Sequence, residues 1–341
     1  MQYKSIWIKN GRLEMEVGNV GAAIMRLLVP DANGKLGDVV LGYEKPEDYL
    51  ESKYYFGAAV GRVCNRIGGA KIPIDGRIYK LDCNETARKN TLHGGANSFE
   101  KMIWDLTECC GANWKGVQAH ALIPDMYNGF PGNLDVSITY KLTDAGELEI
   151  NYCATTDRPT VCALTNHSYF DLSCGEADNI LDHRIKIFAD YFTPVSSNMV
   201  TTGEVLSVRN TALDLRRLRR IGDGISMGGY HIETVGGGYD HNFVLQGADG
   251  DFIQAAAVYD ELTGRAMEVF TTEPGVQFYS GTFIDAHKGK YSRAYGPFSG
   301  FALETQHWPD AQNKRHFPSI DLYPDETYSS TTVYRFGTFR A

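Results

Sequence analysis

The feature that most constrains the fold is an alternation of apolar and polar residues with a period of two. Apolar side chains occupy every second position over 136–142 and again over 148–154. This period is typical of strands that bury one face. The segment 143–147 between the two runs has the composition of a turn, and Gly146 is free to adopt a positive φ. The sequence therefore predicts an antiparallel hairpin.

The rest of the chain also favours strands. Thirty-six glycines and twelve prolines interrupt it throughout, and 12% of its residues are aromatic, a class that packs well on a pleated surface. The one window with helical signals is short and lies near 46–52. We find no βα alternation, no repeat of 20 to 50 residues and no linker. We expect a single all-β domain over residues 1–341, a large antiparallel β-sandwich with few short helices.

Charge and cysteine content indicate the compartment and exclude some partners. The formal net charge is −9, which disfavours binding to nucleic acid. Lys4 and Lys9 interrupt the N-terminal apolar run, so we expect no signal peptide, and no stretch has the length of a membrane span. The seven cysteines include no C-x-x-C pair, which indicates reduced thiols. We expect a cytoplasmic protein without a nucleic-acid or membrane partner.

Several common catalytic motifs are absent. The sequence has neither G-x-G-x-x-G nor G-x-x-x-x-G-K-[ST], and it lacks H-E-x-x-H. These absences disfavour glycine-loop dehydrogenases and kinases and zinc hydrolases. We expect neither a cofactor nor a metal.

Two strand-like segments contain unusual polar residues. If the segment 165–170 is extended, His167 shares one face with Thr165 and Tyr169. A structural histidine is the alternative. In the segment 301–306, Glu304 points away from the apolar face, where a carboxylate is costly unless it meets a polar cavity. An exposed edge strand is the alternative there.

Three further clusters add polar groups. They read G-R-V-C-N-R-I at 61–67, L-H-G-G at 92–95 and Y-D-H-N-F at 239–243. Each alone fits loop chemistry or a surface ion pair. Together, amide, imidazole, guanidinium and carboxylate groups beside aromatic rings are suited to a neutral polyhydroxylated ligand. We interpret them as a sugar site in which one histidine and one glutamate act as general acid and general base.

These segments, in this order, resemble the aldose 1-epimerase (galactose mutarotase) family. Further matches are D-x-x-x-G-F-P-G at 125–132, P-G-V-Q-F-Y at 274–279 and E-T-Q-x-x-P-D at 304–310. The resemblance runs from about residue 10 to the end of the chain. It implies the galactose mutarotase-like supersandwich, in agreement with the strand pattern.

The resemblance also implies an activity, the interconversion of α and β anomers of free hexoses such as galactose and glucose by ring opening and reclosure. It implies that Glu304 is the base at the C1 hydroxyl and His167 the acid at the ring oxygen. The residues implied to hold the sugar are Asn65, Arg66, His93, Ser168, Tyr169, Asp240 and Gln277. Ordinary pKa values of about 4.3 and 6.5 leave a window in which Glu304 is ionised and His167 protonated. A neighbouring carboxylate would raise the pKa of His167 toward neutrality.

Departures from the family and competing functions remain open at this stage. Asp171 stands where the family favours Asn, and Trp308 where it favours Phe, which bears on the preferred hexose. One alternative is a sugar-binding or sensing protein without turnover. A glycoside-processing enzyme would need two carboxylates, such as Asp240 with Glu304. A sugar-phosphate epimerase would need a cationic cluster. We expect a monomer or a homodimer.

Overall fold

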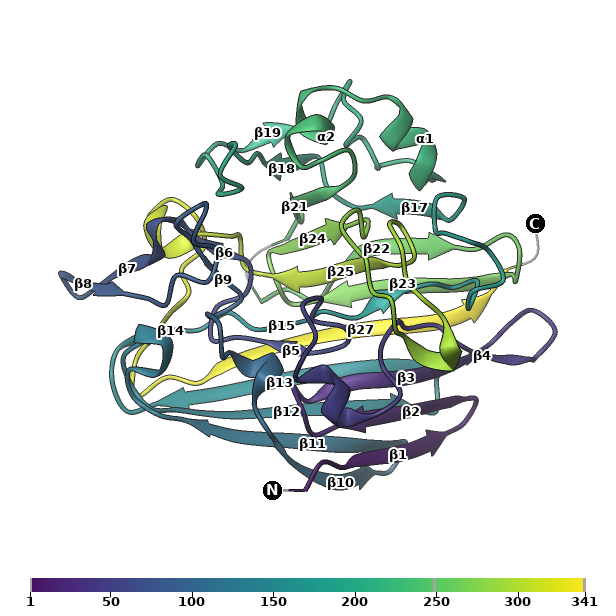
Figure 1. Ribbon diagram of the computed structural model, residues 1–341, viewed down its shortest axis with the longest axis horizontal. Helices are drawn as coiled ribbons and strands as arrows, with labels where there is room; N and C mark the ends of the chain where they lie inside the picture. The colour runs from purple at the N-terminus through teal and green to yellow at the C-terminus, as the bar shows by residue number, and fades with distance from the viewer. Residues whose placement is uncertain (1, 248–249, 340–341) are drawn as a thin grey trace.

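The structure is a computed structural model that describes residues 2–247 and 250–339. Large antiparallel sheets dominate it (Figure 1). The nine-stranded sheet has the order β10 (Asp105–Gly111), β11 (Trp114–Ile123), β12 (Leu134–Thr143), β13 (Glu147–Thr156), β27 (Tyr328–Thr338), β23 (Arg265–Thr271), β22 (Ile253–Tyr259), β17 (Arg184–Ile187) and β20 (Arg219–Arg220).

A six-stranded sheet and a four-stranded sheet complete the main layers. The six-stranded sheet has the order β16 (Tyr169–Phe170), β25 (Phe301–Gln306), β24 (Gly275–Tyr279), β21 (Asp240–Val244), β18 (Tyr191–Thr193) and β19 (Leu206–Ser207). The four-stranded sheet runs β1 (Ser5–Asn10), β2 (Leu13–Gly18), β3 (Ala23–Pro30) and β4 (Leu36–Asp38).

Four two-stranded ladders accompany these layers. They pair β5 (Ala59–Val60) with β15 (Thr165–Asn166), β6 (Arg66–Ile67) with β9 (Thr91–Leu92), β7 (Lys71–Ile74) with β8 (Arg77–Lys80), and β14 (Thr160–Val161) with β26 (Asp321–Leu322). All the strand pairs within these sheets and ladders are antiparallel. The all-β prediction is confirmed.

The predicted hairpin is confirmed in detail. Strands β12 and β13 pair antiparallel up to Leu142 opposite Leu148, and Gly146 adopts φ +80° in the turn. The alternating apolar residues Val136 and Ile138 are fully buried. The period-two pattern therefore located the strands, their turn and the buried face.

The helices are short, and their prediction was only partly right. The window near 46–52 forms a single 3₁₀ turn, η1 (Pro46–Tyr49). Two α-helices were missed, α1 (Ile221–Ser226) and α2 (Tyr230–Thr234), because glycines within and before them mask the helical pattern. The other 3₁₀ turns are η2 (Gly68–Ala70), η3 (Phe99–Lys101), η4 (Tyr127–Gly129), η5 (Lys290–Ser292) and η6 (Ala311–Asn313). In the part of the chain that is described, we find no helix with the length and apolar character needed to cross a bilayer.

The largest apolar core joins the nine-stranded and six-stranded sheets. The Tyr334 hydroxyl of β27 donates to the carbonyl of Leu303 on β25, and its ring packs 5.1 Å from that of Phe170. Leu303 therefore points into the core. Because side chains alternate along a strand, Glu304 points to the other face of the same sheet, as the sequence predicted. That face forms the floor of the candidate site.

Candidate active site

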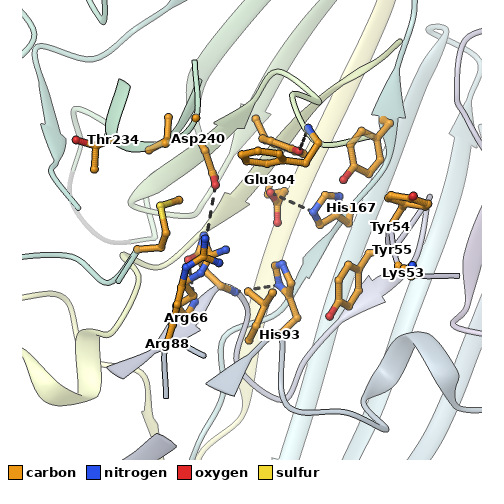
Figure 2. A pocket seen from close by; sticks show the side chains of 18 of the residues that line it. Lys53, Tyr54, Tyr55, Arg66, Arg88, His93, His167, Thr234, Asp240 and Glu304 are labelled. Atoms are coloured by element: carbon orange, nitrogen blue, oxygen red, sulfur yellow. Dashed lines mark hydrogen bonds and ion pairs between the residues drawn. The ribbon is translucent and has the colours of Figure 1, made fainter. Parts of the chain in front are cut away.

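A cavity of about 490 Å³ lies over this polar face of the six-stranded sheet (Figure 2). Seven of the nine predicted site residues line it, namely Asn65, Arg66, His93, His167, Tyr169, Asp240 and Glu304. They lie in β6, β16, β21 and β25, directly before β6, directly after β9, and between β15 and β16. Strand pairing brings residues spread over 240 positions of the sequence to this one cavity. Arg66 on β6 lies opposite Leu92 on β9, and Gln277 on β24 lies opposite Glu304 on β25.

The two predicted catalytic residues face each other across the cavity floor. The distance from His167 Nε2 to Glu304 Oε1 is 3.5 Å, and their side chains are 5% and 3% exposed. Glu304 Oε2 and His167 Nδ1 are buried without a hydrogen-bond partner among the residues described. Since buried polar atoms normally have partners, the carboxylate oxygen is an acceptor available to a ligand hydroxyl.

Two tyrosine rings enclose the imidazole of His167. Tyr169 stacks on it at 4.8 Å, and Tyr55 lies at 5.8 Å on a nearly parallel plane. Tyr55 also contacts the ring of His93 at 4.6 Å. The rings exclude water from the imidazole and supply flat apolar surface of the kind that packs against a sugar ring.

Burial controls the protonation of the pair. Desolvation lowers the pKa of His167 to about 4. Desolvation, reinforced by Asp240 and opposed by Arg66, raises the pKa of Glu304. The expectation that a neighbouring carboxylate raises the pKa of His167 is therefore wrong, because the loss of hydration on burial dominates and lowers it. The two opposite pKa shifts favour the neutral pair in the sugar-free cavity, with the shared proton on Glu304.

Asn65 and His93 form a second, rigid part of the site. The backbone N–H of Asn65 donates to His93 Nδ1 at 3.1 Å, and the backbone N–H of His93 donates to the backbone carbonyl of Asn65 at 3.0 Å. Both residues adopt positive φ, 57° and 51°, a conformation that non-glycine residues adopt at a cost and often at functional sites. With Nδ1 acting as acceptor, the neutral His93 ring has its proton on Nε2 and is a donor there.

Arg66 connects the cavity to a carboxylate that lies outside its lining. Its Nε and Nη2 donate to the two oxygens of Glu85 at 3.0 and 3.2 Å, and its Nη1 lies 3.9 Å from Asp240 Oδ2. The bidentate pair with Glu85 fixes the guanidinium plane. Asp240 accepts a 2.6 Å hydrogen bond from Gln277 Nε2, and burial raises the pKa of Asp240.

Two predicted site residues lie outside the cavity lining. The Ser168 hydroxyl donates to Asn166 Oδ1 at 2.6 Å, and Gln277 lies beside Glu304 in the sheet and holds Asp240. Arg62 is also absent from the lining, since its guanidinium donates to the carbonyls of Pro131 and Gly132. The departures Asp171 and Trp308 do not line the cavity either.

The sequence analysis missed twelve of the nineteen lining residues. The additional residues are Lys53, Tyr54, Tyr55, Arg88, Leu92, Met199, Glu233, Thr234, Val235, Gly236, Tyr279 and Phe283. Tyr279 ends the P-G-V-Q-F-Y segment and could have been found from its strand register opposite Asp240. Leu92 lies in the two-residue strand β9, and the others lie in loops or the short helix α2. None of these elements is long enough to show period-two alternation.

One group of side chains has the composition of a metal site. The ligand atoms of His93, His167 and Glu304 all lie within 4.8 Å of one another. To bind a metal, His93 would have to release either its hydrogen bond from the Asn65 amide or its Nε2 proton. The set therefore fits a metal ion less well than it fits a ligand with hydroxyl groups.

The fold and the site together define a class of protein. It is an antiparallel β-sandwich whose polar sheet face carries a buried carboxylate and imidazole, surrounded by tyrosines, an arginine, an asparagine and an aspartate. This arrangement is suited to acid/base chemistry on a polyhydroxylated ligand.

Comparison with known proteins gives the family. Residues 4–335 match the aldose 1-epimerase family. The chain is 42% identical to galactose mutarotase of Homo sapiens, covering 97% of this chain and 93% of that protein. It is 34% identical to aldose 1-epimerase of Escherichia coli K12, over 93% and 90%. The chain belongs to the aldose 1-epimerase family.

Solved structures agree with this assignment. A GalM/aldose epimerase homologue from C. elegans superposes with a TM-score of 0.88 at 27% identity and covers 99% of this chain and 100% of that one. Galactose 1-epimerase from Lactobacillus acidophilus has a TM-score of 0.87 at 26% identity, with 100% and 96% coverage. The predicted supersandwich fold is confirmed.

Proposed function

We propose that this protein is an isomerase that interconverts the α and β anomers of free hexoses such as galactose and glucose. The observation that carries the proposal is the 3.5 Å contact between the buried His167 Nε2 and Glu304 Oε1 in the cavity over the six-stranded sheet. Relatives at 34% and 42% identity named aldose 1-epimerase and galactose mutarotase support it.

The reaction needs only proton transfers. Ionised Glu304 takes the proton from the C1 hydroxyl, the bond from C1 to the ring oxygen breaks, and the ring oxygen takes a proton from protonated His167. The product is the open-chain aldehyde. Rotation about the C1–C2 bond presents the other carbonyl face, and the reverse transfers close the opposite anomer. Each residue regains its starting protonation state, so no cofactor is required by this scheme.

The neutral pair of the empty cavity and the ion pair of this scheme contain the same number of protons. One proton transfer from Glu304 to His167 converts the first into the second. Burial disfavours both charged forms, so the sugar hydroxyls and the nearby Arg66 have to stabilise the carboxylate when the ligand binds. In this proposal the sugar hydroxyls are bound by Asn65, Arg66, His93 and Asp240. Tyr169 packs against the sugar ring. Ser168 holds Asn166 in place through its hydrogen bond, and Gln277 holds Asp240.

Polarimetry tests the activity. Freshly dissolved α-D-galactose, α-D-glucose and galactose 6-phosphate are followed with and without the purified full chain, in the presence of EDTA. Faster relaxation of a free hexose to the same final rotation supports the proposal. Acceleration of the phosphate ester alone would favour a sugar-phosphate epimerase, and saturable sugar binding without acceleration would favour a binding protein.

Two variants test the residue roles. Glu304→Gln keeps the side-chain shape and His167→Asn replaces the imidazole with a smaller polar group that does not titrate, and each is expected to lower kcat by about 10² to 10⁴. The matched control is Glu149→Gln, which removes an ion pair with Lys141 on the nine-stranded sheet and should leave kcat unchanged. Folded variants with near-normal rates would overturn the assignments.

We also propose that residues 1–341 work as one domain in the cytoplasm, as a monomer or a homodimer, without a nucleic-acid or membrane partner. The net charge of −9 supports the exclusion of nucleic acid. The seven cysteines, all free in the described chain, support a reducing compartment.

A further inference from the structure

A second cleft, separate from the sugar cavity, is lined by arginines. It has a volume of about 630 Å³ and is formed by Arg209, Asn210, Thr211, Asp214, Arg216, Arg217, Arg219 and Met227. The segment 209–220 contains five arginines and one aspartate in a chain whose net charge is −9. We call this surface the arginine cleft. Positive charge is thus concentrated on one concave surface of an acidic protein.

One of these arginines is held by internal ion pairs. Arg216 donates to both oxygens of Asp214 at 2.8 and 2.7 Å and to Asp190 at 2.8 Å. Its donors on the carboxylate side are therefore occupied, and it acts as a fixed part of the cleft wall. Arg209 approaches Asp190 only to 4.0 Å.

Arg217 and Arg219 keep their hydrogen-bond donors for a ligand. Arg217 is exposed, and neither it nor Arg219 has a carboxylate within 4.0 Å in the described parts of the chain. The contact that Arg219 makes is with the sulfur of Met227, a weak acceptor. The cleft contains the guanidinium groups of four arginines, and only two carboxylates among the described residues, those of Asp190 and Asp214, lie near them. The cleft therefore has an excess of positive charge. Planar guanidinium groups match the geometry of phosphate oxygens.

An apolar pocket continues from the arginine cleft. It has a volume of about 310 Å³, shares Asn210, Thr211 and Met227 with the cleft, and is also lined by Leu213 and by residues 228–232. The Tyr230 side chain is 69% exposed and packs edge-on against His231 at 5.3 Å. The glycines at 228 and 229 leave open space where side chains would stand. An exposed aromatic ring beside an open apolar pocket offers a stacking surface for a flat ring.

We propose that the arginine cleft and the adjoining pocket bind a nucleoside diphosphate. The two phosphates lie against Arg217 and Arg219, and the base enters the apolar pocket beside Tyr230. The combination selects this class of ligand, because an inorganic anion would use the arginines alone and an uncharged nucleoside would use the pocket alone.

The site is connected to the sugar cavity through one short helix. Tyr230, His231 and Ile232 of α2 line the apolar pocket, while Glu233 and Thr234 of the same helix line the sugar cavity. Figure 1 shows α1 and α2 at the top of the molecule, at about the level of β18 and β19. A ligand that fixes α2 is therefore expected to change the affinity for sugar, and the sugar to change the affinity for the ligand by the same factor.

Isothermal titration calorimetry of the full chain tests the proposal. UDP, ADP, inorganic pyrophosphate and uridine are titrated at one low and one high salt concentration. We expect both nucleotides to bind more tightly than pyrophosphate, uridine to bind least, and nucleotide affinity to fall with salt. The double variant Arg217→Gln/Arg219→Gln should weaken both nucleotides and pyrophosphate by about tenfold or more. Tyr230→Ala should weaken the nucleotides and leave pyrophosphate unchanged.

The matched control is Arg315→Gln, which removes an exposed arginine that lines a different pocket and should change nothing. All the substituted side chains are exposed or half-buried, and unfolding midpoints verify that the variants fold. The proposal is overturned if no nucleotide binds saturably to the folded wild type, or if the double variant binds as the control does. Equal affinity for pyrophosphate and nucleotides, unaffected by Tyr230→Ala, would refute the nucleoside part.

Galactose affinity measured with and without UDP tests the connection through α2. This last measurement is the only one of these that depends on the proposed function.

Discussion

Lowering the pH tests the electrostatics of the Glu304–His167 pair directly. The catalytic scheme needs one proton on the pair, and a second proton inactivates it because Glu304 then has no basic form. The second proton binds to His167, whose pKa burial lowers to about 4. Since the pKa is lowered, the active one-proton form persists as the pH falls and is lost only as the pH passes through about 4.

The difference from an unperturbed histidine is large. With a pKa of about 4, about 90% of the protein keeps the one-proton pair at pH 5. With the ordinary value of about 6.5, only about 3% would keep it. The structure therefore predicts that kcat/KM at pH 5 keeps about 90% of the plateau value of its acid limb, whereas a solvated histidine would leave about 3%, a loss of about thirtyfold.

The measurement is an initial-rate polarimetric profile from pH 4.5 to 8 at constant ionic strength. The uncatalysed rate is subtracted at each pH, and circular dichroism verifies that the protein stays folded. Because kcat/KM reports groups of the free enzyme, it is the correct quantity for the sugar-free pair. An acid limb with its midpoint between pH 6 and 7 would refute the argument that burial dominates the protonation of His167.

Three further perturbations follow from particular contacts. Glu85→Gln removes the partner that orients Arg66, so KM for the hexose should rise about tenfold with little change in kcat; a fall in kcat alone would contradict this role. Burial raises the pKa of Glu100 to about 7, so the native carboxyl stays protonated while the unfolded one ionises as the pH rises. Urea unfolding at pH 5 and 8 should show the stability of Glu100→Gln rising relative to wild type by about 2.5 kcal/mol, and an unchanged difference would exclude a buried carboxyl. A Cβ on Gly57, at φ +65°, would lie 2.2 Å from a backbone oxygen, so Gly57→Ala should cost about 3 kcal/mol. Gly76→Ala, at φ +74° with open space around it, should cost only about 1 kcal/mol.

The strands were predictable where a single chain segment contains the whole signal. Residues 136–154 alternate cleanly, and their hairpin forms in the expected register. The short helices α1 and α2 were not predictable, because Gly222 and Gly224 lower the helical propensity of a six-residue element that is stabilised by packing. Local sequence determines an element only when the element is long enough to show its own period.

The candidate site was predictable in its residue types but not in its electrostatics. The alternation in 301–306 placed Glu304 on the face opposite Leu303, and the family motifs brought His167 and Asp240 to the same ligand. The sequence pattern gave no sign that Tyr55 encloses His167, because Tyr55 lies in a loop 112 positions away in the chain.

The sequence by itself determined the all-β architecture, the buried faces of its longest strands and the groups available for acid/base chemistry. Only the tertiary structure decided how these groups ionise. A pKa depends on how much water the surrounding atoms displace, and around His167 those atoms come from Tyr55, Tyr169 and Glu304. The same reasoning applies to the arginine cleft, since the sequence shows five arginines but only the fold shows which of them lack a carboxylate partner among the described residues.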